Sequence, residues 1–439
     1  MNQKNSIAIV GGGLAGCEAA WQLALQGFQV TMFEMRPLQS TAAHQTDHLA
    51  ELVCSNSLKS RETHNAHGLL KAELNLLGCK LLELALASSV PAGAALAVDP
   101  TVFSAGVEEA LSSLDNLKIE RGEIHSAVDL KKEFDTVIIA TGPLTSGPLS
   151  LELKSLAGDD GLYFYDAIAP VIYKESIDLD RAFFASRYGK SGEDYINCPL
   201  NRDEYYDFVQ ALVEAEKVPF KEYEQAKHFE GCLPLEVMAG RGLETLAFGP
   251  FKPVGLEVEG KRPYAVVQLR QENKEGTLYN LVGCQTRMTY GEQKRLFRKL
   301  PGLAKAEFAR LGSMHRNSYI NAPKYLNEHL ELKSHPGIYI AGQLTGVEGY
   351  VESIASGLWV ARQVAASFNM GMAPRADRKF ILGALMNYLM EANQENFQPM
   401  NVNFGLMEAA PKQKKMGKRE RREMQAQAAL EHLQGLDWL

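Results

Sequence analysis

Residues 6–16 read SIAIVGGGLAG, and this stretch decides the fold. The apolar residues 6–10 predict a short buried strand, and the glycines that follow have the spacing Gly11-x-Gly13-x-x-Gly16. Apolar residues then recur at helical spacing from 17 to 26, and residues 29–33 predict a second strand closed by Glu34. Strand, glycine turn, helix and strand within about thirty residues are typical of a dinucleotide-binding β-α-β unit.

Each glycine of this turn has a physical role in such a unit. The first makes the tight turn, the second lets the backbone approach a pyrophosphate, and the third lets helix and strand pack closely. Glu34 stands where a carboxylate accepts hydrogen bonds from ribose hydroxyls. The alternative is a glycine turn that serves packing only. The residues expected to bind the dinucleotide here are Gly11, Gly12, Gly13, Leu14, Ala15, Gly16 and Glu34.

Two later strands predict which dinucleotide is bound. Residues 136–140 end in Thr141-Gly142, residues 337–341 end in Gly342-Gln343, and both strands return to the same sheet. In flavoproteins with two dinucleotide folds such strand ends close over FAD, although Gln343 stands where an Asp is usual. A second GxGxxG motif is missing, so NAD(P)H is expected to visit as a co-substrate. We therefore predict FAD as the resident cofactor, with contacts from Thr141, Gly142, Gly342 and Gln343.

The length of 439 residues favours two domains. Between residues 146 and 319 aromatics, prolines and short strand-like runs such as 264–269 and 278–282 replace the β-α-β texture. The predicted fold class is α/β: an FAD-binding Rossmann-type (glutathione-reductase-like) domain from residues 1–145 and 320–439, with C-terminal helices. Residues 146–319 are predicted to form an inserted α+β domain.

Composition limits where the protein acts. The sequence has neither a signal peptide nor an apolar run near the roughly 20 residues that span a bilayer, so we expect a cytoplasmic protein without a membrane. The net charge of −7 makes any RNA contact depend on a local basic face. A solvated helix face is the alternative for the basic cluster near the end, which comprises Lys412, Lys414, Lys415, Lys418, Arg419, Arg421 and Arg422.

Six cysteines occur without any CxxC pair, which argues against a disulfide framework and a zinc ribbon. Cys54 lies among small polar residues, and Cys232 lies between Gly231 and a Leu-Pro turn, so both are candidates for reactive thiols. Acidic neighbours of Cys232 would raise its pKa, which counts against an activated thiolate. His44 and His48 lie near Cys54 without a clear fourth ligand, so no metal is expected. The other four cysteines are interpreted as packing residues.

Longer motifs resemble one family closely, from residue 6 to about residue 406. This is the folate- and FAD-dependent tRNA uracil-5-methyltransferase family, related to the flavoprotein that modifies wobble uridines. The motifs are GGGLAG (11–16), FEMRP (33–37), ELVCSNSLKS (51–60), VPAGAALAVD (90–99), ATGPLTS (140–146), FEGCLPLEVMA (229–239), KRPYAVVQLRQ (261–271), MHRNSYINAP (314–323), AGQLTGVEGYVES (341–353) and NFQPMNVNFGL (396–406).

The resemblance implies a definite reaction. Methylenetetrahydrofolate supplies a one-carbon unit, FAD reduced by NAD(P)H supplies electrons, and the product is 5-methyluridine at position 54 of the tRNA T loop. Cys232 would be the nucleophile that adds to uracil C6, Cys54 would handle the C5 proton, and His315 would stack on folate or base. The residues alone favour a structural role for His315. The partners implied are tRNA and folate, with no stable protein partner.

Several alternatives stay open. A relative could methylate a ribosomal RNA uridine by the same chemistry, because substrate choice lies in surface contacts. A wobble-uridine-modifying flavoprotein is expected to carry a longer C-terminal helical domain than this chain. A disulfide reductase lacks support without a redox cysteine pair. From another class, an RNA-binding module with a structural FAD is the rival.

Overall fold

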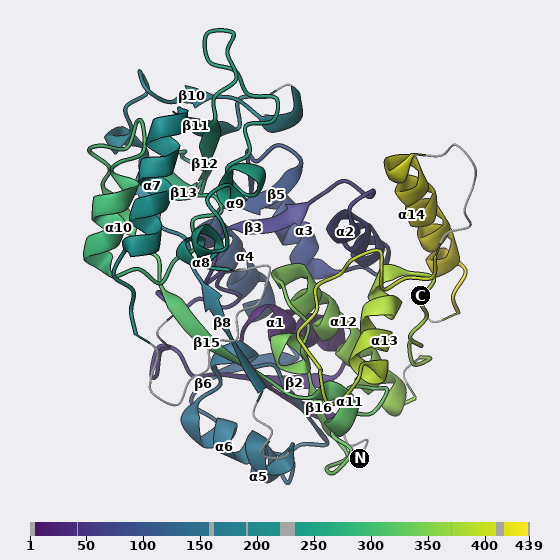
Figure 1. The fold of residues 1–439 in the computed structure, drawn as a ribbon. Coiled ribbons are helices and arrows are strands. Elements are labelled where there is room, and N and C mark those ends of the chain that lie inside the picture. The colour runs from purple at the N-terminus through teal and green to yellow at the C-terminus, as the bar shows by residue number, and fades with distance from the viewer. Residues whose placement is uncertain are drawn as a thin grey trace.

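The computed structural model describes residues 5–41, 43–157, 162–189, 192–219, 233–369, 371–409 and 417–437. Two hydrophobic cores organise them: a larger one around the N-terminal strands and the helices of both chain ends, and a smaller one between residues 172 and 306. Figure 1 shows the two bodies joined by a pair of strands. None of the described helices is long and apolar enough to cross a membrane.

The larger body contains a five-stranded parallel sheet. Its order is β16-β7-β1-β2-β6, so the first strand lies at the centre between two neighbours. Strands buried on both faces need continuous apolar runs, and the central strand has four fully apolar residues after Ser6. The strands are β1 (Ser6–Val10), β2 (Gln29–Glu34), β6 (Leu117–Arg121), β7 (Thr136–Ile139) and β16 (Ile338–Ile340).

Two helices pack tightly together against this sheet. Helix α1 (Leu14–Leu25) begins three residues earlier than the predicted start at residue 17, because Gly13 is already its N-cap. Helix α12 (Tyr350–Ser367) begins after Gly349. A Cβ at Gly357 of α12 would overlap the carbonyl of Ala15, so the two helix backbones touch. This contact joins the two ends of the chain in one body.

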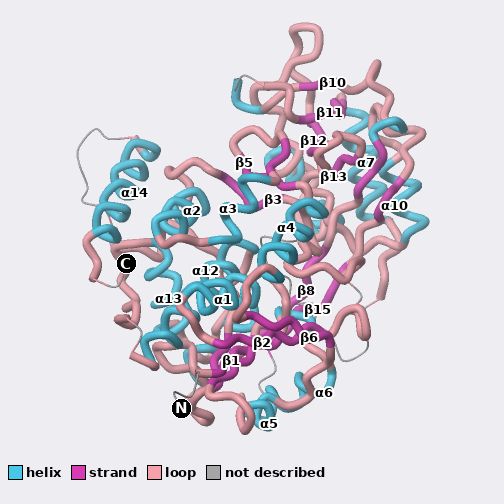
Figure 2. Tube along the Cα trace, turned by 180° about the vertical axis from the view of Figure 1, so that it is seen from behind, coloured by secondary structure: helices cyan, strands magenta, loops and turns pink. Residues whose placement is uncertain are grey.

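The remaining helices of this body surround the sheet (Figure 2). A small three-stranded sheet, β3-β5-β4, was not predicted, although its strands fall in two quoted motifs. Its strands are β3 (Ser57–Ser60), β4 (Ser89–Val90) and β5 (Ala95–Val98). The helices are α2 (Ala66–Leu76), α3 (Lys80–Ala87), α4 (Pro100–Ser112), α5 (Ala127–Leu130), α6 (Gly147–Leu156), α11 (Ala322–Tyr325), α13 (Ile381–Glu391) and α14 (Lys418–Gln434).

The smaller body is a six-stranded antiparallel sheet with the order β10-β11-β12-β13-β9-β14. Two of its strands match the predicted runs 264–269 and 278–282 within two residues. The strands are β9 (Val171–Tyr173), β10 (Phe183–Phe184), β11 (Tyr195–Leu200), β12 (Ala265–Gln271), β13 (Leu278–Leu281) and β14 (Phe308–Arg310). Its helices are α7 (Arg202–Glu214), α8 (Leu235–Gly240), α9 (Thr245–Phe248) and α10 (Tyr290–Phe297).

A two-stranded ribbon connects the bodies. Strand β8 (Leu162–Ala167) pairs antiparallel with β15 (Met314–Tyr319), and both run between the two sheets in Figure 1. The antiparallel sheet is thus inserted in the chain between β7 and β16 of the parallel sheet. This confirms the predicted fold class, an α/β Rossmann-type domain with an inserted α+β unit. The boundaries at residues 145 and 320 stay a prediction.

A buried carboxyl group holds the start of α13. Glu73 of α2 is fully buried and accepts the backbone N–H groups of Ile381 at 2.7 Å and of Leu382 at 2.8 Å. Burial raises the pKa of Glu73 to about 8, and the two N–H donors only partly oppose this effect. The proton on this carboxyl is therefore part of the stable fold at neutral pH.

The raised pKa predicts a pH-dependent stability. The contribution of Glu73 is fully present below the ordinary carboxyl pKa of 4.5 and is lost as the pH rises through about 8. The free energy of unfolding of the wild type, minus that of Glu73→Gln, should therefore fall between these values, because the amide stays neutral. Urea unfolding at a series of pH values measures this difference. Parallel pH profiles of the two proteins would contradict the prediction.

Candidate functional site

A deep cleft opens at the carboxyl edge of the parallel sheet. Its space is about 1040 Å³ when the mouth open to solvent is included. In open α/β sheets ligands bind at this edge. Predicted residues that line the cleft are Gly11, Gly13, Leu14, Ala15, Glu34, Thr141, Gly142, Gly342 and Gln343. Lining residues that the sequence did not reveal include Arg36, Glu51, Gly122, Glu123, Ile124 and Tyr350.

The glycines of the turn are needed for different reasons. Gly11 has a φ of +105°, and a Cβ there would lie 2.6 Å from the carbonyl oxygen of Ala140. A Cβ at Gly16 would overlap the carbonyl of Gly11, so this residue lets helix and strand pack as predicted. A Cβ at Gly13 would meet nothing in the chain closer than 4.0 Å. The fold therefore requires Gly11 and Gly16, whereas at Gly13 the bare backbone serves the cleft.

Two residues that were predicted to contact the dinucleotide, Gly12 and Gly16, lie behind the wall of the cleft. Gly16 packs against Gly11, and a Cβ at Gly12 would collide with Leu49. The N–H of Gly12 donates to Oε2 of Glu34 at 2.9 Å. Neither Gly12 nor Gly16 lines the cleft, so each shapes the turn from behind.

A buried chain of charges fixes Glu34 at the end of β2. The backbone N–H and Nε of Arg36 donate to its Oε1 at 3.0 and 2.9 Å. Nη1 of the same arginine donates to Oε2 of Glu51 at 2.9 Å, and only 2% of the arginine side chain is exposed. Oε1 of Glu34 thus has two donors and Oε2 has one, which leaves Oε2 able to accept one more hydrogen bond.

These contacts keep Glu34 charged. Burial by itself raises the pKa of this carboxyl, but the hydrogen bonds and charge of Arg36, with the N–H of Gly12, outweigh it and lower the pKa overall. A charged carboxylate with a spare acceptor site is what a ribose hydroxyl requires. The contact of Glu34 with a ribose itself stays a prediction.

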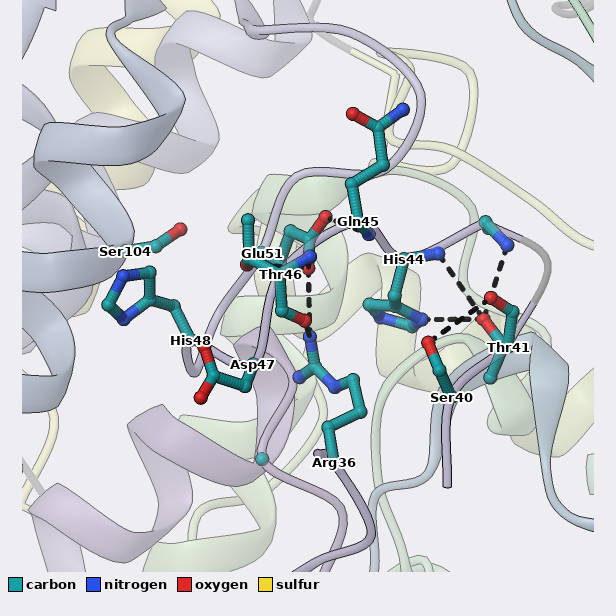
Figure 3. Close-up of polar contacts among 12 residues, drawn as sticks. Arg36, Ser40, Thr41, His44, Gln45, Thr46, Asp47, His48, Glu51 and Ser104 are labelled. Atoms are coloured by element: carbon teal, nitrogen blue, oxygen red, sulfur yellow. Dashed lines mark hydrogen bonds and ion pairs between the residues drawn. The ribbon is translucent and has the colours of Figure 1, made fainter. Parts of the chain in front are cut away.

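Glu51 ties the segment 43–51 to the same arginine (Figure 3). It also accepts the backbone N–H groups of Gln45 at 2.8 Å and Thr46 at 3.2 Å. In this loop His44 contacts the hydroxyl of Thr41 at 2.7 Å and His48 contacts Glu108 at 2.7 Å. Figure 3 shows the two histidines apart on either side of Glu51. Among the residues that the structure describes no group of side chains could hold a metal ion.

The later strand ends close the cleft from the other side. Gly142 and Gly342 both adopt positive φ, +64° and +74°, which glycine permits. Gln343, in place of the usual Asp, donates from Nε2 to Oε2 of Glu348 at 2.7 Å. Helix α12 starts beside it, with Gly349 as N-cap and Tyr350 in the wall of the cleft. The positive end of an 18-residue helix therefore lies at the cleft.

Cys54 is held beside the cleft by Tyr350. The tyrosine hydroxyl accepts the N–H of Cys54 at 2.7 Å and the N–H of Ser55 at 3.1 Å. Nη2 of Arg310, from β14 of the smaller body, donates to the carbonyl of Cys54 at 3.3 Å. The thiol is half-buried and forms no disulfide. It thus lies where the parallel sheet, the ribbon and the inserted sheet meet.

Asn56 fixes the same segment to the inserted sheet. Its side chain is fully buried, and Nδ2 donates to the carbonyls of Val98, Gln271 and Glu272 at 2.9 to 3.2 Å. Its Oδ1 accepts Nε of Arg270 at 3.0 Å. The loop that carries Cys54 is therefore bonded on one side to α12 and on the other to the end of β12.

Four other cysteines behave as predicted from their surroundings. Cys17, Cys79, Cys198 and Cys284 are all buried and unpaired in disulfides. Burial raises the pKa of each thiol, to about 12 for Cys198. They stay protonated at neutral pH and serve packing.

Two predicted site residues are not placed by the structure. Cys232 lies outside the described residues. His315 lies on β15, but its side chain is not described. Glu236, expected to raise the pKa of Cys232, bonds elsewhere: it accepts the hydroxyl of Thr286 at 2.8 Å and the N–H of Arg287 at 2.9 Å.

A parallel β-α-β sheet with a cleft at its carboxyl edge, and a second sheet inserted in the chain between two of its strands, defines a Rossmann-type nucleotide-binding fold. Residues 6–371 match the family described as "Glucose inhibited division protein A". The chain belongs to this family and, within it, to the TrmFO methyltransferases, as its relatives show. It is 50% identical over 430 residues to the "Methylenetetrahydrofolate--tRNA-(uracil-5-)-methyltransferase TrmFO" of Natranaerobius thermophilus, with 98% of each chain covered. This confirms the resemblance found in the motifs.

Further comparisons agree on family and fold. The protein of the same name from Desulforudis audaxviator is 53% identical over 430 residues, covering 97% of each chain. Among solved structures, Aquifex aeolicus GidA in its form I crystal has a TM-score of 0.71 at 14% identity. That match covers 100% of this chain and 76% of GidA, and it speaks for the fold alone.

Proposed function

We propose that this protein methylates C5 of uridine 54 in the T loop of tRNA, with methylenetetrahydrofolate as one-carbon donor and NAD(P)H as reductant of FAD. The observation that carries the proposal is the placement of Cys54: a half-buried thiol is tied through Tyr350 to the wall of a dinucleotide cleft. The names of the relatives supply the reaction class. The proposed tRNA substrate fits an activity in the cytoplasm.

The residues of the cleft fit FAD. The open space above Gly13 admits a pyrophosphate, and Oε2 of Glu34 has room for a ribose hydroxyl. Gly342, Gln343 and the start of α12 would hold the remainder of the cofactor. When bound, FAD passes electrons from NAD(P)H to the one-carbon unit.

The chain itself supplies thiol chemistry to the uracil. Uracil C5 is a poor nucleophile until a group adds at C6, and a cysteine thiolate is suited to that addition. We assign the addition to Cys232, after which C5 bonds to the one-carbon unit. A base then removes the C5 proton, the bond between the methylene carbon and its nitrogen carrier breaks, and hydride from the reduced cofactor, when bound, would convert the methylene to a methyl group. The thiolate of Cys232 then leaves C6 as the double bond between C5 and C6 returns. Cys54 is assigned the C5 proton, and His315 a stacking contact to folate or base.

The test is methylation of an unmodified tRNA transcript with carbon-labelled methylenetetrahydrofolate and NADH, run beside S-adenosylmethionine. Label is expected at uridine 54 from folate only. Cys232→Ala should abolish it while the flavin stays bound, and Cys198→Ala is the matched control, because Cys198 is a buried packing thiol. Methylation by Cys232→Ala at the wild-type rate would refute the nucleophile. Label found only in ribosomal RNA, or at the wobble position of tRNA, would show that this site is the substrate in place of uridine 54.

A further inference from the structure

Cations gather along one edge of the larger body. They come from β3, from the residue that follows it and from the first half of α14. We call them the basic strip: Lys59, Arg61, Lys418, Arg419, Arg421 and Arg422. The protein as a whole carries a net charge of −7, so a local excess of cations stands out against its general charge.

The strip begins next to the reactive loop. Strand β3 starts three residues after Cys54, and its pairing with β5 is irregular between Ser57 and Ser60. Lys59 lies in that irregularity with a φ of +63°, a conformation uncommon for a residue with a side chain, and its N–H donates to the hydroxyl of Ser57 at 3.1 Å. Strained residues of this kind tend to cluster at functional sites.

A third cation adds to the field there. The Lys71 side chain is buried, and its ammonium donates to the carbonyls of Ser60 at 2.9 Å and His67 at 3.1 Å. Burial lowers its pKa to about 8; Glu352 opposes this, while the charges of Lys59 and Arg61 lower it further. The cations of this region are close enough to repel one another, which an anion between them would relieve.

Helix α14 brings the other half of the strip to the same edge. Its buried residues Ala426, Ala429 and Leu433 face the body, and Figures 1 and 2 both show α14 beside α2. His64, before α2, lies 3.8 Å from Glu423 of α14. The charged first half of α14 is thereby fixed close to the start of α2, which follows β3 in the chain.

Most cations of the strip form no ion pair with the part of the chain that the structure describes. Within the described ranges Lys59, Arg61, Lys418 and Arg421 form no ion pair, and Arg419 pairs with Glu423 in an exposed geometry that contributes little. Arg422 lies over the ring of Phe404 at 5.2 Å, which adds an aromatic surface. Unpaired cations beside an aromatic ring match a polyanion whose bases can stack.

We propose that the basic strip binds the phosphate backbone of the RNA substrate and leads it toward Cys54. This inference rests on the proposed function and names the surface through which the RNA is held. Phosphate contacts fix the position of a nucleic acid on a protein, while the reacting base is presented separately to the cleft. The strip supplies the phosphate contacts, and the cleft receives the reacting base.

The test is binding of an unmodified tRNA transcript to the flavin-loaded full chain over a range of salt concentrations. The variants are Lys418→Gln with Arg421→Gln, and the same pair with Lys59→Gln. Each phosphate contact contributes about 0.7–0.9 to the slope of log K against log salt. We expect the double variant to lower the slope by about 1.4–1.8 and to bind at least about tenfold more weakly at roughly 0.1 M salt.

The matched control removes two cations elsewhere. Lys294→Gln with Lys299→Gln changes the charge equally. Lys294 is exposed on α10, Lys299 is exposed two residues after this helix ends, and α10 lies opposite α14 in Figure 1. This control should bind with the wild-type slope. Flavin occupancy and melting temperature verify that every variant is folded. Equal slopes for wild type and strip variants, with tRNA bound by both, would overturn the role of the basic strip in RNA binding and leave the proposed function standing. Failure of the wild type to bind tRNA would overturn the proposed function with it.

Discussion

Gly13→Ala is expected to give a folded protein that purifies without its flavin. The added methyl group would meet no atom of the chain closer than 4.0 Å, and a φ of −80° is open to alanine. The methyl would instead occupy the place where a pyrophosphate approaches the backbone. Loss of one or two charge-assisted hydrogen bonds, about 1.5–3 kcal/mol each, weakens the binding of FAD at least about tenfold.

Flavin absorbance per polypeptide, before and after addition of FAD, measures this effect. The comparison is Gly11→Ala, where φ is +105° and the Cβ would press on Ala140, so this variant should misfold rather than merely lose flavin. If Gly13→Ala retained full flavin, the absence of a side chain at Gly13 would not matter for cofactor binding.

Tyr350→Phe is expected to separate methyl transfer from flavin reduction. The ring stays in the cleft wall, but the oxygen that accepts the N–H groups of Cys54 and Ser55 is lost. The loop that carries the thiol would shift, and a misplacement of about 1 Å at a reacting group can lower a rate roughly 100-fold. We expect kcat for methylation to fall about 10- to 100-fold.

Reduction of bound flavin by NAD(P)H should continue in this variant. Tyr388→Phe is the control, because its hydroxyl likewise bonds to the main chain, donating to the carbonyl of Gln398 at 2.7 Å, and Tyr388 does not line the cleft. Unchanged methylation by Tyr350→Phe would show that its hydroxyl does not position Cys54. Loss of flavin would show instead that Tyr350 acts on the cofactor.

Local patterns predicted the parallel sheet well. Strands β1 and β2 were placed within one residue, because apolar runs next to glycine turns are a strong short-range signal. The start of α1 was missed by three residues, since Leu14, Ala15 and Gly16 look like part of the glycine turn. The β3-β5-β4 sheet escaped altogether, because strands of two to four residues carry no periodic signal and pair across the chain.

The candidate site could be predicted where a single sequence motif contains the interacting residues. Glu34 follows from the spacing of the β-α-β unit, and FEMRP also contains its buried partner Arg36, which sequence reasoning overlooked. Tyr350 could not be linked to Cys54 in this way, since 296 positions separate the bonded residues. Such a contact depends on the docking of α12 against α1, which no local pattern contains.

The hydrogen bonds of Asn56 impose a particular constraint on how this protein can change over time. Three go to main-chain carbonyls, at Val98, Gln271 and Glu272, and a carbonyl is present whatever residue occupies the position. The fourth depends on a side chain, Arg270. The residues at the three carbonyl positions can therefore change without loss of these bonds. Asn56 and Arg270, in contrast, must be inherited as a pair.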